Sequence, residues 1–414
     1  MNQFLTTSLC VLALSANIAS ANEPEAATAL EFGLDDTLFI ADSVQGKIFA
    51  YDLPDVGVAS RSDDPFNVLD LENIVEDVLR YDRGTLTYND LAVHPVTRDA
   101  YITVSFEHRG KPNWALVSVT PDGMAQKIDL SKIPSSTMEI EDSADDSVSF
   151  WRDIPAPTLT VTDMDFYDGE LFVSGISTGE FASTLRRIPF PFESSSSSSS
   201  IEIFHAAHGQ NETRAPIRAL SVVDIDGTPT VVAAYTCTPL VTIPVAELED
   251  GANVTGKTIA ELGYGNTPLD IVSFAAADME GNVGAYVLVV NREMDADLIT
   301  MENLKAAAES DGISQPIPYL GATVGVPTTP LPLAGVVHAT DQNNQFLLTM
   351  RRNLDTGAME LVSFRKAAYF RLSNFISEYN FPDYQYSEDP MSQGTRMFQN
   401  MLKVDEDFPD QTVN

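Results

Sequence analysis

One pattern of apolar and polar positions recurs along most of the chain. A short strand of alternating apolar residues leads into a turn of Asp, Gly or Asn, and a very apolar strand, a polar turn and a third alternating strand follow. The clearest copy spans Leu30–Leu53, where Asp35 and Asp36 form the turn. In this copy we expect residues 38–41 to be the buried strand and residues 48–51 to be the third strand.

Five further copies share this pattern, and they start near Asn89, Thr162, Ile217, Pro268 and Ala334. Their spacing of roughly 50 to 70 residues is longer than the 40 to 50 of common propeller repeats, which predicts inserted loops. Small antiparallel sheets of this kind bury their faces by packing against one another in a closed radial array. The sequence therefore predicts an all-β fold, a six-bladed β-propeller with long inserted loops and a C-terminal extension. A large sandwich and a pair of smaller all-β domains are the alternatives.

Several segments depart from the repeat. Residues 301–310 read as a helix inside the fifth copy, and no alternation of helices and strands of the parallel α/β kind is present. Ser194–Ser200 is a run of serines that predicts a flexible loop, and the acidic stretch Glu139–Asp146 predicts a solvated one. Residues 373–414 are rich in Asn, Asp, Gln, Tyr and Met and lack the repeat, so we assign them to the C-terminal extension and residues 22–372 to the propeller.

The beginning of the chain resembles an export signal. Residues 1–21 carry no charge, contain an apolar run from Leu9 to Leu14, and end on the small-residue sequence Ala19-Ser20-Ala21. We expect cleavage after Ala21 and a periplasmic or extracellular location. No later apolar run reaches the length of about 18 residues that a transmembrane helix needs. Cys237 is the only cysteine after the predicted cleavage point, so an internal disulfide is excluded there.

The charge of the chain narrows the choice of partners. Its 60 acidic residues outnumber the 24 Lys and Arg residues, giving a formal net charge of −36. A field of this sign repels phosphate backbones and anionic lipids, so nucleic acids and charged membrane surfaces are disfavoured as partners. A small molecule or a protein is the expected partner, and cations are attracted.

Polar residues at the starts of successive copies are the first candidate site. In a propeller the first strand of each blade lines a central channel, so residues far apart in sequence converge there. The expected channel residues are Glu31, Asn89, Asp90, Asp163, Asp165, Arg218 and Asp270. Carboxylate and amide oxygens are the ligands that calcium prefers. The alternative is that these side chains cap turns and hydrogen-bond to the backbone.

Two strings resemble known propeller families. NDLAVHPVTRDAYIT, which begins at Asn89, resembles the NDxAVDPxG segment of the gluconolactonase-like, calcium-dependent propeller hydrolases, and FGLDDTLFIAD resembles propeller repeats in general, including those of the NHL type. The hydrolase resemblance implies a metal held in the channel by Asn89 and Glu31, with a carboxylate assisting attack by water. Two positions differ from that family: Thr162-Asp163 stands where an Asn-Gly pair is expected, and Asp270 lies in TPLD instead of a Pro-Asp-Gly turn.

The string FHAAHGQNET is the second candidate site. His205 and His208 lie three positions apart and Glu212 follows four positions later, a set that can bind zinc or copper. The alternative is a polar loop whose histidines make local hydrogen bonds. Cys237 lies in the apolar string VVAAYTCTPLV, which predicts a buried, inert thiol, although it can serve as a third ligand in a copper site with the two histidines.

The sequence therefore leaves three functions open. The first is an exported propeller that binds a ligand or a protein, because no serine-hydrolase elbow, phosphate-binding glycine loop, haem box or paired CxxC motif is present. The second is a metal-dependent lactone or ester hydrolase with Glu31, Asn89, Asp163 and Asp270 around a divalent ion. The third is a metal-handling or redox protein that uses His205 and His208.

Overall fold

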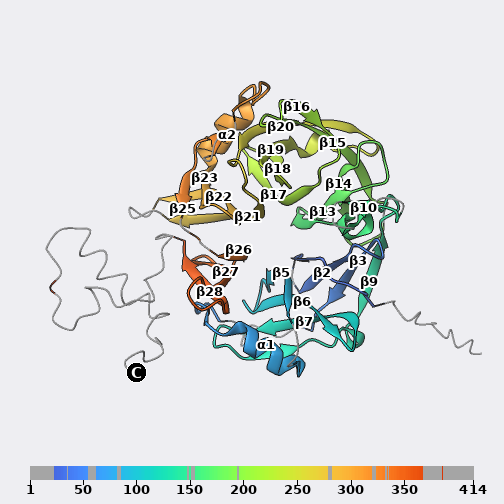
Figure 1. Ribbon diagram of the computed structural model, residues 1–414, viewed down its shortest axis with the longest axis vertical. Coiled ribbons are helices and arrows are strands. Elements are labelled where there is room, and N and C mark those ends of the chain that lie inside the picture. The colour runs from blue at the N-terminus through green and yellow to red at the C-terminus, as the bar shows by residue number, and fades with distance from the viewer. Residues whose placement is uncertain are drawn as a thin grey trace, which may run out of the picture.

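A computed structural model describes residues 23–366 and 385, except residues 35, 55–61, 82–84, 147–148, 151–153, 194, 278–281, 319–322, 332 and 334. The predicted signal peptide lies outside the described residues, as does the C-terminal extension apart from residue 385. The described part of the chain is built almost entirely from short antiparallel strands arranged around a centre (Figure 1). The prediction of an all-β, propeller-like fold is confirmed.

Four of the sheets are separate and each has four strands. In pairing order they are β1 (Ala29–Phe32), β2 (Thr37–Asp42), β3 (Lys47–Asp52) and β9 (Ser135–Glu139); β5 (Thr87–Val93), β6 (Ala100–His108), β7 (Lys111–Val119) and β8 (Ala125–Lys127); β21 (Pro268–Ala277), β22 (Val283–Asn291), β23 (Ala296–Thr300) and β25 (Thr329–Leu331); and β26 (Val336–Asp341), β27 (Phe346–Arg352), β28 (Met359–Arg365) and β4 (Asn67–Val68).

Most of the remaining described strands form one large sheet instead of two separate four-stranded sheets. A ten-stranded sheet contains the path β12 (Asp163–Tyr167), β13 (Glu170–Ile176), β14 (Ser183–Pro189), β15 (Ser197–His205), β20 (Asn253–Glu261), β19 (Pro239–Pro244), β18 (Thr228–Tyr235) and β17 (Ile217–Ile225), with β16 (Gln210–Glu212) and β24 (Val324–Gly325) paired off this path. Its two antiparallel halves are joined because the outer strands β15 and β20 pair in parallel. A two-stranded sheet, β10 (Ser149–Phe150) with β11 (Ile154–Pro155), completes the set.

The first strands of the six predicted copies form the inner wall. Contacts run from β5 to β1, β12, β17, β21 and β26 and back to β5, so the described inner strands close a ring. The β1 sheet therefore lies between the β5 and β12 sheets, although β5 follows β1 in the chain. To give this order of sheets, the chain leaves the first sheet after β3 and supplies β4 to the β26 sheet. It then forms the β5 sheet and returns to the first sheet with β9.

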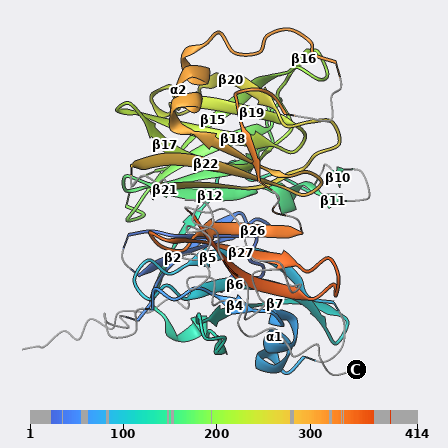
Figure 2. The same cartoon turned by 90° about the vertical axis from the view of Figure 1, so that its left-hand side faces the viewer.

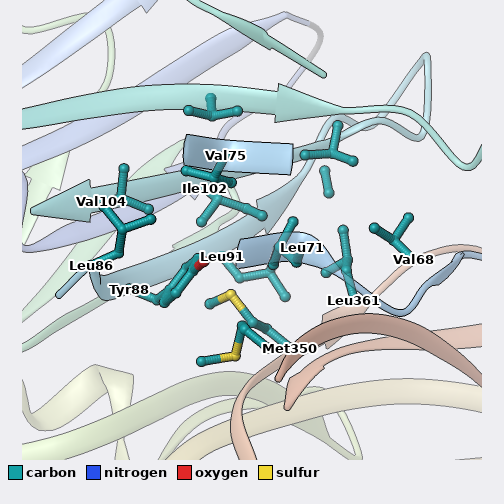
Figure 3. Close-up of a cluster of buried hydrophobic side chains, with 14 of the residues drawn as sticks. Val68, Leu71, Val75, Leu86, Tyr88, Leu91, Ile102, Val104, Met350 and Leu361 are labelled. Atoms are coloured by element: carbon teal, nitrogen blue, oxygen red, sulfur yellow. The ribbon is translucent and has the colours of Figure 1, made fainter. Parts of the chain in front are cut away.

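A buried apolar cluster packs between the β5 and β26 sheets (Figure 3). Val68 of β4 pairs with Leu361 of β28, and Leu71 and Val75 on helix α1 (Leu71–Leu79) are buried against them. Strand β5 contributes Tyr88 to the same cluster. Because these residues are far apart in the sequence, their burial links the last sheet to the β5 sheet.

The two α-helices lie outside the sheets, at opposite ends of the molecule (Figures 1 and 2). Helix α2 (Met301–Glu309) confirms the helix predicted within the fifth copy. Thr300 caps it by accepting a hydrogen bond from the Asn303 backbone N–H at 3.2 Å. Short 3₁₀ helices within the described residues span Leu130–Lys132, Ala156–Leu159 and Val245–Glu247. Among the described residues no helix combines the length and apolarity needed to cross a membrane.

Part of the serine run forms a strand instead of the predicted loop. Its residues 197–200 lie in β15, where they pair with β14 on one side, and Ser200 also pairs with Asn253 of β20 on the other. Ser198 donates its hydroxyl to Asp142 at 2.7 Å, and the buried Arg186 lies 2.6 Å from the same carboxylate. Asp142 belongs to the acidic stretch Glu139–Asp146, for which the sequence predicts a solvated loop. The serine run and this residue of the acidic stretch therefore have hydrogen-bonding partners in neighbouring strands.

Candidate functional site

The predicted channel residues separate into two groups. Glu31, Asp90, Asp163, Asp165 and Asp270 line a central cavity of about 140 Å³ formed by the inner strands. The two other predicted residues are absent from its lining. Asn89 instead donates its side-chain amide to the Ala27 carbonyl at 3.0 Å and to the Ser105 hydroxyl at 2.7 Å.

A repeated irregularity of the inner strands explains this division. Strands β5, β17, β21 and β26 each skip one residue in their pairing near the start of the strand, and the skipped residues are Asn89, Arg218, Leu269 and Val337. A bulge of this kind re-aims the side chains that follow it. Asp90 and Asp270 therefore reach the cavity, whereas the bulged residues before them do not.

The channel aspartates hold neighbouring inner strands together. Asp90 accepts the Leu30 backbone N–H of β1 at 2.6 Å, Asp163 accepts that of Leu220 in β17 at 2.7 Å, and Asp270 accepts that of Ala339 in β26 at 3.0 Å. Each of the three also accepts the N–H of the residue after it, and Asp165 adds a bond from Val222 at 2.5 Å. The structure thus gives these carboxylates the backbone-binding role that was the alternative to calcium binding.

The same carboxylates raise one another's affinity for protons. Burial raises the pKa of Glu31 well above its usual value, and the charges of Asp165, Asp163 and Asp90 raise it further. Burial is also the main cause that raises the pKa of Asp90 and of Asp165 to about 6. Among the described residues, no three of the channel carboxylates bring ligand atoms within 4.8 Å of one another.

Sequence reasoning missed His338, which stands in the inner strand of the sixth copy. Its Nδ1 lies 3.4 Å from an Asp90 oxygen and 3.7 Å from an Asp270 oxygen. Burial lowers the pKa of His338, but the hydrogen bond with Asp270 and the charges of both aspartates outweigh burial and raise it. Arg218 acts on His338 through its positive charge. The position of His338 within the repeat was a signal that would have placed it in the channel.

The second predicted set is brought together by a short hairpin. His205 ends β15, and the turn after it closes through hydrogen bonds from the backbone N–H groups of His208 and Gly209 to the His205 carbonyl. Gly209 has φ +65°, a left-handed conformation that glycine adopts without strain. Strand β16 then places Glu212 opposite Ile203, two residues before His205, so Glu212 and His205 share one face of the hairpin.

A loop of the neighbouring strands supplies the third member. Residues 236–238 connect β18 to β19, and Cys237 in this loop is only partly buried. The ligand atoms of His205, His208 and Cys237 all lie within 4.8 Å of one another, and we call these three residues the thiol–imidazole cluster. The prediction that Cys237 is buried within a strand is wrong, because the apolar strand ends at Tyr235.

Glu212 lies behind the imidazoles instead of within the cluster. One of its oxygens is 2.9 Å from Nδ1 of His205, and the other is 2.5 Å from Nδ1 of His208. Nε2 of His205 lies 3.3 Å from the Thr238 hydroxyl and 3.8 Å from an oxygen of Glu261. A carboxylate that binds the second ring nitrogen is the usual way to orient a histidine ligand for a metal.

Glu261, at the end of the apolar strand β20, is a second carboxylate that sequence reasoning missed. It is 3% exposed and accepts the backbone N–H groups of Ala206 at 2.7 Å and Ala207 at 3.2 Å. Its other oxygen accepts the Thr238 hydroxyl, so Glu261 ties the histidine turn to the cysteine loop. A lone carboxylate within an apolar strand was the available signal, because buried charges are rarely left without partners.

The surrounding groups control protonation of His205. Burial lowers the pKa of this histidine, but hydrogen bonds with Cys237 and Glu212 and the negative charge of Glu261 outweigh burial and raise the pKa to about 9. Burial raises the pKa of Glu212, whereas the hydrogen bonds with His208 and His205 lower it more strongly.

The cluster lies beside a cavity of about 500 Å³. His208 and Cys237 line the cavity, together with Glu261 and the loop of residues 263–267, and His205 is 0% exposed behind them. Soft sulfur and imidazole donors select zinc or copper over calcium or magnesium. The structure thus combines a set of soft ligands with a cavity large enough for a small molecule.

Comparisons with known proteins give no assignment. No protein-family model matches the chain, and no curated protein matches it. Solved structures with similarity include Drosophila Semaphorin 1b, extracellular domains 1–2, at TM-score 0.33 and 10% identity over 83% of this chain and 87% of that one. Drosophila Semaphorin 1a, extracellular domains 1–2, gives TM-score 0.34 and 8% identity over 84% and 87%. Similarity at these scores carries no argument about the fold, ligand or partner of this chain.

Proposed function

We propose that the protein is an exported six-bladed propeller that binds a transition-metal ion, zinc or copper, at the thiol–imidazole cluster. The observation that carries this proposal is the convergence of the ligand atoms of His205, His208 and Cys237 within 4.8 Å. Two imidazoles and one thiolate are a donor set found in zinc and copper sites. The proposal narrows the more general function of an exported ligand-binding propeller to one site and one class of ligand.

The six-blade description is supported by the inner ring. The ten-stranded sheet contains two antiparallel runs of four strands, β12–β15 and β17–β20, which are joined by the parallel contact of β15 with β20. Counting each run as a blade gives six blades, each with one of the six inner strands. Export is supported by the uncharged residues 1–21 with their apolar run and small-residue end.

The groups around the cluster hold its side chains in place. Glu212 contacts both imidazoles through Nδ1, and the Thr238 hydroxyl lies 3.3 Å from Nε2 of His205. Glu261 and Thr238 fix the turn and the loop that carry the ligands. Groups that hold the ligand side chains in place in this way raise metal affinity, because the ligands need little further ordering when the ion binds.

Replacing Glu212 with glutamine tests the proposed orienting role. Glutamine offers one acceptor oxygen instead of two, so only one of the two imidazoles can keep its Nδ1 partner. We expect the apparent affinity for Zn²⁺ to fall by about 10- to 100-fold, the range typical for loss of a second-shell partner. Competition titration of the purified full chain against a zinc chelator, at constant pH, measures this change.

Glu202→Gln is the matched control for this variant. Glu202 lies on the same strand as His205, at an odd spacing that places it on the opposite face of β15. We expect its zinc affinity to equal that of the wild type. Equal affinities for Glu212→Gln and wild type, with bound metal in both, would show that Glu212 does not orient the ligands.

A further inference from the structure

We infer that the bound metal keeps one coordination position open toward the 500 Å³ cavity and binds there a small, neutral molecule through a nitrogen donor. This inference rests on the proposed function, because it requires a metal at the thiol–imidazole cluster. It goes further by making the cluster a ligand-binding centre instead of a closed structural site. Zinc sites of the first kind have three protein ligands, whereas closed structural sites have four.

The three ligands occupy one side of the metal position. His205 is completely buried beneath the turn, and His208 and Cys237 stand at the wall of the cavity. The side chain of His208 is 42% exposed. A metal held between these three donors therefore has protein beneath it and the cavity on its remaining side.

The neighbouring carboxylates already have other partners. Both oxygens of Glu212 bind imidazole nitrogens. One oxygen of Glu261 binds two backbone N–H groups, and the other accepts the Thr238 hydroxyl. Among the described residues no further His, Cys, Asp or Glu places a ligand atom within 4.8 Å of all three cluster atoms at once. A fourth donor is therefore expected to come from a molecule in the cavity.

Charge selects a neutral donor over an anion. A divalent ion carries two positive charges, which the Cys237 thiolate and the Glu212 carboxylate together balance. The Glu261 carboxylate, with an oxygen 3.8 Å from Nε2 of His205, adds a further negative charge. An anion entering this cavity meets no excess of positive charge, whereas a neutral nitrogen donor has no electrostatic penalty.

The cavity limits the size of the ligand. Its volume of about 500 Å³ falls within the range of roughly 300 to 1,000 Å³ that is typical of small-molecule sites. Its other walls include Tyr264, Asn266 and Pro318. The Asn266 amide already bonds the Leu262 carbonyl and the Thr267 backbone N–H, so it shapes the wall of the cavity, which suits a heterocyclic ligand of modest size.

Cobalt substitution gives a direct test with an observable metal. The full chain is loaded with Co²⁺, and its thiolate-to-metal and d–d absorption bands are recorded during separate additions of imidazole and azide. We expect imidazole to change the spectrum in a saturable way while one cobalt per chain is retained after desalting. Azide is expected to need at least a tenfold higher concentration for the same fractional change.

A cavity-filling variant shows whether the added ligand uses the cavity. Thr236 is exposed at the cavity wall next to Cys237, so Thr236→Phe is expected to keep one cobalt per chain and to lose the response to imidazole. Thr228→Phe adds the same ring on the same sheet, beside a different cavity, and is expected to keep both properties.

The possible results separate the two proposals. Cobalt bound with an unchanged spectrum, or removed by imidazole, would overturn the open position and leave the metal site standing. Azide binding more tightly than imidazole would overturn the choice of a neutral donor. An imidazole response that persists in Thr236→Phe would place the open position away from the cavity. Failure of the wild type to bind cobalt, zinc or copper would overturn the proposed function itself.

Discussion

Replacing Cys237 with alanine is expected to weaken zinc binding by roughly 100- to 1,000-fold. The apparent free energy of zinc binding at structural sites is about 10–16 kcal/mol and is shared among about four ligands. One ligand therefore contributes about 3–4 kcal/mol, and each 1.4 kcal/mol is about a tenfold change in affinity. The thiolate is also the charged member of the thiol–imidazole cluster, so its loss removes the strongest electrostatic attraction for the ion. Competition titration with a chelator, followed by metal analysis, measures the effect.

His208→Ala is expected to give a loss of similar size, because it removes a second ligand from the same ion. The side chain of His208 is 42% exposed, so its truncation leaves no buried cavity, and the fold is expected to be retained. His108→Ala is the matched control, since His108 is also exposed, at the end of β6, and lies outside the cluster. Undiminished zinc affinity in both Cys237→Ala and His208→Ala would contradict metal ligation by these residues.

Asp165→Asn is expected to stabilise the protein at pH 7.5 by about 1–3 kcal/mol and to have little effect at pH 4. Burial is the main cause that raises the pKa of Asp165 from 3.8 to about 6 in the folded protein. A carboxyl with a raised pKa favours folding at a pH below its unfolded value, and this contribution is lost as the pH rises through about 6. The shift of about 2 pH units sets the upper limit of the effect at about 3 kcal/mol.

Asparagine is suited to this test because it keeps an oxygen that accepts the Val222 backbone N–H. Urea unfolding of both proteins between pH 4 and pH 8 measures the difference. Asp168→Asn is the control, since Asp168 lies on the exposed turn after β12 with φ +49°, which asparagine tolerates. A stability difference between Asp165→Asn and wild type that stays constant with pH would contradict the raised pKa.

Much of the fold is readable from the sequence because each sheet is local. The strands of the first copy and the helix in the fifth follow directly from apolar periodicity and turn residues, as β1–β3 and α2 show. The pairing of β4 with β28 and of β9 with β3 was not predictable, because these strands are short and join segments far apart in the chain. The serine run became a strand because neighbouring strands supply partners that local propensity does not reveal.

The candidate sites were predictable to different degrees. His205 and His208 are close in sequence, so their pairing was visible, but Cys237 joins them only through the parallel contact of β15 with β20. Sequence spacing suggested that Glu212 is a ligand, whereas the register of the β15–β16 hairpin places it at Nδ1 of both rings. In the channel, the repeat predicted the convergence of Asp90, Asp163 and Asp270. The bulges that precede Asp90 and Asp270 and direct these two side chains into the cavity are not disclosed by one sequence.

The most direct test of the proposed metal site is the stoichiometry of zinc and copper on the purified, metal-stripped full chain. Calorimetric titration at pH 7.5, followed by elemental analysis after desalting, is expected to give one tightly bound ion per chain in the wild type. The same measurement on the His205→Ala/His208→Ala variant is expected to give none. A wild type that retains no stoichiometric zinc or copper, or a double variant that retains as much as the wild type, would contradict the assignment of the thiol–imidazole cluster as a metal site.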